Sequence, residues 1–323
     1  MEFIIILIAL AVEQYYKNTE NYRHFGWFTT YCDWMQQKTD SFASQFPSAS
    51  GPISLLILLV PLLLVVSFVE SAFANLGSIF GFLFGIVVLI YSLGPRDMNA
   101  QVDKYIESVS AGDTEGALLH ANEFFSGHHY DSEIEGSPAT IAGLMKGGIL
   151  LAFNNRILAV LFWFLILGPV GALLYRLNTL LLERFAGGYF GHAVEDEGDS
   201  ESDFQAAIQR LYMILGWIPA RLCVIAFALA GSFSDTLLCW RCASDFINNN
   251  NDELIVSSGL HALKMELDTS DSNSELSSEL VIDEAELQST TVNEVGQIVA
   301  LVKWSVVIVV TIIALMTIVG WIY

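Results

Sequence analysis

The sequence predicts an all-α, polytopic integral membrane protein with five or six membrane helices and a small helical cytoplasmic cap. Hydrophobic residues make up 54% of the 323 residues, and charged residues only 15%. Ordinary soluble domains carry about 25% charged residues. Several uncharged apolar runs are long enough to cross a bilayer, and the net charge of -21 is concentrated outside them. We therefore expect lipid to surround most of the chain.

The first apolar segment, residues 3–12, ends just before Glu13. No Lys or Arg precedes this segment, and no small-residue cleavage pattern follows it, so it does not resemble a secretory signal. We expect a short or tilted helix that carries Glu13 near one end.

Two uncharged runs of 18 residues, 52–69 and 76–93, are joined by the short link ESAFAN and predict a helical hairpin. Gly77, Gly81 and Gly85 form a double GxxxG pattern, which allows close helix approach. The partner is either another membrane helix or, more commonly, a neighbouring helix of the same chain.

Residues 94–156 are polar and predict a helical cytoplasmic region. Within them, Ala111 and Gly112 are typical of a helix end, and Asp113 is typical of the cap of a following helix. This pattern predicts a helical hairpin, the small cap of the fold.

The run 157–182 is interrupted by Gly168, Pro169 and Gly171. It either spans the membrane with a kink or folds back as two half-helices. The distribution of Lys and Arg places residues 17–51 in the cytoplasm under both alternatives, but it does not fix the side of the C-terminal third.

The stretch WIPARL, residues 217–222, follows an amphipathic helix. Four apolar residues recur there at helical spacing: Phe204, Ile208, Leu211 and Leu215. We expect Pro219 to break this helix and residues 222–238 to turn into the bilayer. Arg221 would then lie at the membrane boundary.

Residues 266–294 are rich in Ser, Asp and Glu, and they predict a flexible acidic linker. The uncharged run 304–323 predicts a C-terminal membrane helix, since its 20 residues match a hydrocarbon core of about 30 Å. The predicted organisation is a membrane hairpin region, a polar helical region, a membrane core, a linker and a final helix. In order, these segments are 1–93, 94–156, 157–245, 246–297 and 298–323.

Several functions are excluded or unsupported by the sequence. No basic face is available for nucleic acid, so we expect no nucleic-acid partner. No nucleotide-binding, metalloprotease or hydrolase motif is present, and we predict neither a metal site nor a cofactor.

Four motifs in order resemble the AmpE branch of the AmpE/CobD-CbiB family of membrane proteins. They are LIYSLGPRD (89–97), AGDTEGALLHA (111–121), FWFLILGPVGALLYRLNTL (162–180) and WIPARL (217–222). The resemblance implies a bacterial inner-membrane regulatory or sensory protein linked to cell-wall recycling and β-lactamase induction. It also implies a partner such as an AmpD-like amidase or another membrane protein.

The same family contains the cobinamide-phosphate synthases. This chain lacks the acidic residues of the synthase pattern. The positions where the synthase pattern has carboxylates fall here at Gly147, Leu151, Tyr212 and Met213. These side chains cannot bind a hard cation, so we expect no synthase activity. A membrane-bound cobinamide-phosphate-synthase-like transferase is the first alternative, and a structural subunit of a membrane complex is the second.

The residues at the motif positions predict a ligand-binding site, and we predict no catalytic residues. Arg176 and Arg221, with Asn178 and Glu13, could form a pocket for an anionic metabolite, because guanidinium groups bind phosphates and carboxylates in a bidentate manner. Equally, Glu13 could form a buried ion pair with either arginine that only fixes helix packing.

Overall fold

The computed structural model is helical, and the residues that it describes contain no β-strand. The prediction of an all-α polytopic membrane protein is therefore confirmed. Helices suit such a chain because they satisfy their own backbone hydrogen bonds in lipid. The structure describes residues 2–15, 26–43, 50–93, 98–126, 136–185, 199–243, 250–265 and 284–320.

The helices divide between two compact units. Unit 1 consists of Met1–Asp97, Asn155–Pro219 and Val310–Tyr323, and unit 2 consists of Met98–Asn154 and Ala220–Val309. Neither unit is one continuous stretch of chain. Two long helices, α9 (Asp199–Ala230) and α12 (Glu284–Ile318), contain residues of both units.

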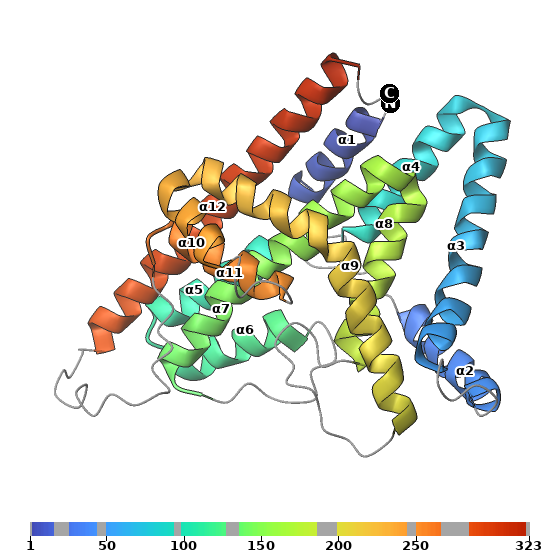
Figure 1. The fold of residues 1–323 in the computed structure, drawn as a ribbon. Coiled ribbons are helices and arrows are strands. Elements are labelled where there is room, and N and C mark those ends of the chain that lie inside the picture. The colour runs from blue at the N-terminus through green and yellow to red at the C-terminus, as the bar shows by residue number, and fades with distance from the viewer. Residues whose placement is uncertain are drawn as a thin grey trace. The chain divides into compact units, whose positions relative to one another are not determined.

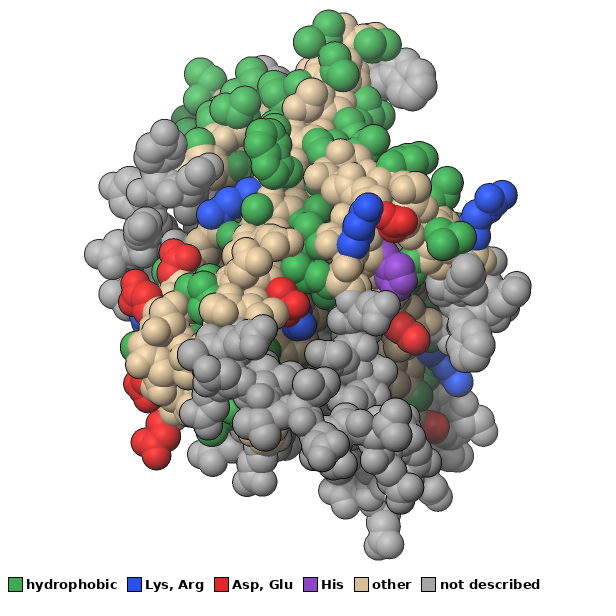
Figure 2. Space-filling model, turned by 90° about the vertical axis from the view of Figure 1, so that its left-hand side faces the viewer, with side chains coloured by type: hydrophobic (Ala, Val, Ile, Leu, Met, Phe, Trp, Pro, Cys, Tyr) green, Lys and Arg blue, Asp and Glu red, His purple; other side chains and the backbone are tan. Residues whose placement is uncertain are grey.

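Within the described ranges, four helical stretches are long and apolar enough to cross a membrane: Gly51–Leu76, Pro138–Phe185, Asp203–Ala230 and Gln288–Ile318. Two shorter helical stretches are also apolar: Glu2–Val12 and Ser78–Ser92. Many large apolar side chains are exposed on them, such as Phe68 at 75%. Figure 2 shows apolar side chains, in green, at the surface of the face that it draws. Such surfaces favour contact with lipid.

Unit 1 contains the predicted hairpin as α3 (Ser50–Leu76) and α4 (Ser78–Ser92), which pack together in opposite directions (Figure 1). The chain reverses at Gly77, whose φ of 145° favours glycine. The ESAFAN stretch forms the last turns of α3 instead of a separate link. The reversal is therefore tighter than the sequence predicts.

The glycines of the GxxxG pattern serve packing inside unit 1. A Cβ added to Gly85 would lie 3.1 Å from Cδ1 of Ile5 in α1 (Glu2–Tyr15). A Cβ added to Gly81 would lie 3.6 Å from Cα of Ala74 in α3. These short distances support the internal alternative, in which the glycines let neighbouring helices approach closely.

Helix α8 (Ala159–Phe185) folds back on itself at Gly168, where φ is 65° and ψ is -152°. A Cβ added to Gly171 would lie 2.3 Å from the backbone oxygen of Trp163. In a straight helix, the eight-residue separation would correspond to about 12 Å. Of the two alternatives for this run, the structure has the fold-back into two half-helices, which Figure 1 shows in green.

Helix α9 continues through Pro219, so the prediction of a break there is wrong. Proline lacks an N–H group and normally leaves the carbonyl four residues earlier without its helix donor. Here that carbonyl belongs to Leu215, and it accepts a hydrogen bond of 3.0 Å from Nε1 of Trp163. The tertiary contact replaces the missing helix hydrogen bond, which allows the helix to continue.

Unit 2 contains the predicted cap hairpin as α5 (Met98–Ser110) and α6 (Thr114–Ser126). Gly112 has a φ of 72°, and Oδ1 of Asp113 accepts a hydrogen bond of 2.9 Å from the backbone N–H of Gly116. The predicted helix end and cap are both confirmed.

The remaining helices of unit 2 include α7, α10 and α11: Pro138–Ala152, Phe233–Ala243 and Asn251–Ala262. Helix α11 and the start of α12 fall inside the 246–297 segment that composition predicts as a flexible linker. Burial against other helices stabilises them: Leu254 and Val295 are fully buried. Residues 266–283 lie outside the described part of the chain.

Candidate functional site

A stripe of buried polar side chains lies on the second half of α8. Its members are 5% exposed or less: Tyr175, Arg176, Asn178, Thr179 and Glu183. Tyr175, Thr179 and Glu183 follow one another at intervals of four residues, so their side chains lie along one face of the helix. Arg176 and Asn178 flank this face on opposite sides. The apolar positions between them hold the helix in the core of unit 1, so the fold encloses the stripe.

The fold-back of α8 brings this stripe against the π-helical segment η3 (Phe153–Leu158). The Tyr175 hydroxyl donates to Oδ1 of Asn155 over 2.7 Å, and Nδ2 of Asn155 donates to the Tyr212 hydroxyl over 2.9 Å. Short π-helical segments often occur at functional sites. The result is a buried, neutral hydrogen-bond network that joins η3, α8 and α9.

Arg176 and Asn178 are fully buried in unit 1. The Arg176 guanidinium lies close enough to the Tyr91 hydroxyl on α4 for an electrostatic interaction. Neither amide atom of Asn178 forms a hydrogen bond within the described residues. A buried polar group in this state costs about 1 to 3 kcal/mol, so the position favours an added ligand that bonds to the amide.

The other two predicted site residues are Arg221, which belongs to unit 2, and Glu13. Arg221 is half-buried in unit 2, where its Nη1 lies 3.4 Å from Oδ1 of Asn251 at the start of α11. Glu13 belongs to α1, but its side chain lies outside the described part of the structure. Of the four predicted residues, Arg176 and Asn178 are the two that lie buried on one helix of unit 1.

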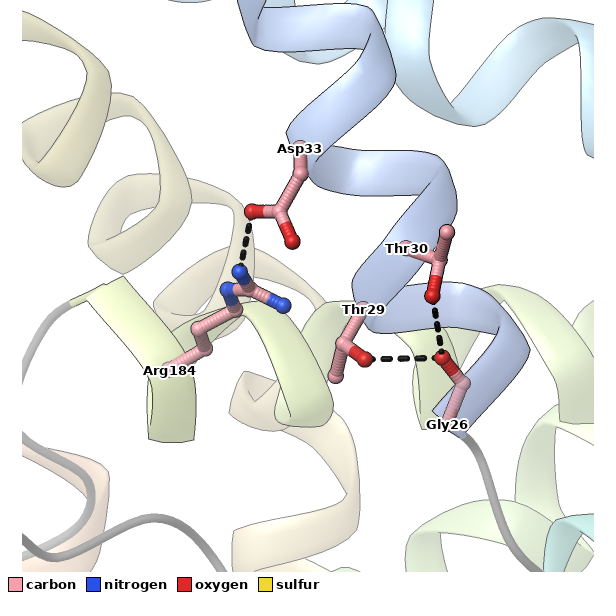
Figure 3. Close-up of polar contacts among 5 residues, drawn as sticks. All are labelled: Gly26, Thr29, Thr30, Asp33 and Arg184. Atoms are coloured by element: carbon pink, nitrogen blue, oxygen red, sulfur yellow. Dashed lines mark hydrogen bonds and ion pairs between the residues drawn. The ribbon is translucent and has the colours of Figure 1, made fainter.

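An ion pair lies at the C-terminal end of α8. Arg184 binds Oδ1 of Asp33 in α2 (Gly26–Ala43), and the hydroxyls of Thr29 and Thr30 donate to the carbonyl of Gly26 in the same helix (Figure 3). Burial raises the pKa of the neighbouring Cys32 thiol to about 12. The thiol therefore stays protonated near neutral pH and is a poor nucleophile.

The positions that carry acids in the synthase pattern are occupied by side chains that do not bind metal. Gly147 and Leu151 are buried, and Met213 is 37% exposed. Tyr212 takes part in the network with Asn155. Within the described residues, no group of three or more His, Cys, Asp or Glu side chains could hold a metal ion.

Sequence reasoning missed Asn155, Tyr175 and Trp163. Asn155 interrupts the apolar run ILLAFNNRILAV, and a polar amide in such a run was the available signal. Tyr175 directly precedes the predicted Arg176. The role of Trp163 depends on a carbonyl of another helix, so no local pattern could reveal it.

Comparisons with known proteins identify the family. The profile of the CobD/CbiB protein family matches residues 6–302. A cobalamin biosynthesis protein CobD of Chromobacterium violaceum is 27% identical over 184 residues, which cover 56% of this chain and 54% of that protein. Its namesake in Stutzerimonas stutzeri is 27% identical over 183 residues, which cover 57% of this chain and 56% of that protein.

The chain therefore spans about half the length of the curated relatives that it matches. No solved structure matches it. These relatives carry the CobD name, so assignment to the AmpE branch stays a prediction. Since the family profile covers nearly the whole sequence, the chain belongs to the CobD/CbiB family.

Proposed function

We propose that this chain is a regulatory or sensory protein of the AmpE type in the bacterial inner membrane, which binds an anionic metabolite of cell-wall recycling. One observation carries the proposal: the buried guanidinium of Arg176 and the buried amide of Asn178 lie on the same half-helix, and the amide has no hydrogen bond among the described residues. A phosphate or carboxylate accepts hydrogen bonds from a guanidinium or from an amide N–H group.

The residues at the synthase-type positions support a binding role over metal-dependent condensation. Leu151 and Gly147 offer no carboxylate oxygen, and Tyr212 is engaged with Asn155. Magnesium prefers oxygen ligands, chiefly carboxylates and phosphates. The network of Asn155, Tyr175 and Tyr212 is neutral and contributes no negative charge, and the carboxylate of the stripe belongs to Glu183.

A second candidate function is a membrane-bound transferase like cobinamide-phosphate synthase. The family match and the CobD relatives favour it more directly than they favour a regulatory role. It requires acidic ligands from positions other than Gly147, Leu151, Tyr212 and Met213. A structural role in a membrane complex is the third alternative, and an AmpD-like amidase is a partner to test in that case.

The test of the regulatory proposal is a β-lactamase induction assay in a strain that lacks this protein. The strain is complemented with wild type, Arg176→Ala, Asn178→Leu or Arg221→Ala at equal membrane abundance. We expect Arg176→Ala and Asn178→Leu to lose the effect of wild type on induction. Arg241→Ala, which changes an exposed arginine, is the matched control and should behave like wild type.

A binding measurement on the purified protein in detergent separates loss of ligand from loss of fold. Leucine is close in size to asparagine and needs no hydrogen bond, so Asn178→Leu should fold at least as stably as wild type. An anhydromuramyl peptide, which carries carboxylates, should raise the thermal unfolding midpoint of wild type but not of Asn178→Leu. Equal shifts in both proteins would refute the site.

The transferase alternative predicts a different pair of results. The purified protein would form cobinamide phosphate from cobyric acid and an aminopropanol phosphate with magnesium and nucleotide, and the deletion strain would show normal β-lactamase induction. Turnover that vanishes on removal of magnesium would replace the regulatory proposal with this second one.

A further inference from the structure

A pocket of about 290 Å³ lies within unit 2, where α5, the start of α6, the start of α7 and α12 meet. It shares no residue with the polar stripe of α8. The volume is close to the lower end of the range for small-molecule sites, about 300 to 1,000 Å³. Its wall combines apolar side chains, among them Val109, Ala117 and Ile141, with a small number of polar groups.

The first polar group is Tyr105, which is only 2% exposed although it lines the pocket. Its hydroxyl forms no hydrogen bond with any other described residue. Burial raises the pKa of Tyr105 to about 12, so the phenol is neutral near pH 7. A buried phenol of this kind usually finds a hydrogen-bond partner, and here the pocket is where a ligand can supply one.

The second polar group is the amide of Gln288 on α12. A Cβ added to Gly112 would lie 3.5 Å from its Nε2 and 3.9 Å from its Oε1, so the amide lies over the bend between α5 and α6. Glycine at 112 leaves this space open and also permits the φ of 72°. Gln288 lines the pocket, and its amide can donate or accept a hydrogen bond there.

The third polar group is Asp113, whose charge indicates which ligand charge the pocket favours. Among the described residues that line the pocket, Asp113 is the only charged one, and its side chain is exposed. One of its carboxylate oxygens caps α6 through the N–H of Gly116. The carboxylate of Asp113 would repel an anion and attract a cation.

We propose that this pocket binds a small organic amine: the ammonium group pairs with Asp113, a polar group bonds to Tyr105 or Gln288, and the carbon skeleton packs on Val109, Ala117 and Ile141. The ligand differs in charge from the anion proposed for Arg176. The pocket therefore gives the chain a second, independent binding site, and its test does not depend on the outcome at α8.

The test uses three probes with one carbon skeleton on the full-length protein in detergent. They are 2-phenylethylamine, 2-phenylethanol and phenylacetate, whose end groups are cationic, neutral and anionic. Dissociation constants are measured by isothermal titration calorimetry or ligand-observed NMR. We expect the amine to bind at least about tenfold more tightly than phenylacetate, with the alcohol in between.

Two variants locate the binding. Asparagine caps a helix about as well as aspartate, so Asp113→Asn keeps the fold of α6 but removes the charge. It should weaken the amine at least about fivefold and leave the alcohol unchanged, whereas Asp103→Asn, at an exposed position of α5, should change neither. Ile141→Trp should fill the pocket and abolish binding of all three probes.

Two results would overturn the proposal. The first is that the three probes bind wild type with equal affinity, or that none binds. The second is that Asp113→Asn and Asp103→Asn change amine affinity by the same factor, because the attraction would then come from general surface charge.

Discussion

Trp163 and Pro219 act on the same backbone oxygen, that of Leu215. Proline removes the helix donor to this oxygen, and the Trp163 indole replaces it over 3.0 Å. The two residues belong to two of the four motifs that carry the family resemblance. The contact gives a physical reason why a tryptophan in one motif and a proline in the other occur together in this chain.

Trp163→Phe should lower the free energy of unfolding by about 1 to 3 kcal/mol, because a buried carbonyl loses its donor. Thermal or denaturant unfolding in detergent measures this. Trp304→Phe is the control, since Trp304 is 63% exposed, and it should have little effect.

The same contact predicts coupling between the two motifs. In Pro219→Ala, the new N–H at position 219 can donate to Leu215, so adding Trp163→Phe should cost less than it does in wild type. A double-mutant cycle gives this coupling energy. Purely additive effects would show that the indole and the proline act independently.

At the level of elements, the decisive feature is the reversal of α8 at Gly168. The φ of 65° and ψ of -152° belong to a region that other residues enter at a cost of about 1 to 3 kcal/mol. The reversal places Tyr175 beside Asn155, which in a straight helix would be about 30 Å away. The polar stripe therefore depends on this one glycine.

Gly168→Ala should lower the unfolding free energy by about 1 to 3 kcal/mol. A Cβ there would meet only ordinary contact, 3.5 Å from Oε1 of Glu70, so the cost is conformational. Gly143→Ala in α7 is the matched control. Nothing lies within 4 Å of its added Cβ, so it should raise stability by up to about 1 kcal/mol. Changes of the same sign in both variants would contradict this account.

An ion pair joins two elements of unit 2. Nζ of Lys146 on α7 lies 2.9 Å from Oε2 of Glu294 on α12, and the lysine side chain is only 10% exposed. Lys146 lies in an apolar helix, whereas Glu294 lies in a polar stretch of α12. The contact helps explain why α12 is ordered at Glu294, within the stretch whose acidic composition predicts a flexible linker.

At the scale of the whole molecule, exposed leucines differ in whether they lie in a stretch that can span a membrane. Leu64 on α3 is 64% exposed and Leu119 on α6 is 63% exposed, but only Leu64 lies in a stretch able to span a membrane. Equal exposure therefore has different consequences at the two positions. One would lie in hydrocarbon and the other in the polar helical region.

Leu64→Arg should reduce membrane insertion, since an arginine at the centre of a span costs about 2.5 to 3.5 kcal/mol. Leu119→Arg, with the same chemical change at the same exposure, should insert normally. The measurement is the fraction of the chain recovered in alkali-washed membranes. Equal losses for both variants would mean that α3 is not surrounded by lipid.

The sequence by itself determined the helical class, the α3–α4 hairpin, the Asp113 cap and the apolar segments suited to a membrane. These features depend on local composition, periodicity and turn residues, all of which are readable along the chain. The family resemblance, together with the ability of guanidinium groups to bind anions, also nominated Arg176 and Asn178.

Only the tertiary structure decided the direction of α8, the continuity of α9 and the partners of the buried groups. Gly168 and Pro169 allow either a kink or a reversal, and contacts from distant segments select between them. Pro219 predicts a break when α9 is considered alone, but an indole from another helix supplies the missing hydrogen bond. Such outcomes depend on pairs of residues far apart in sequence, whose interaction energy exceeds the local preference.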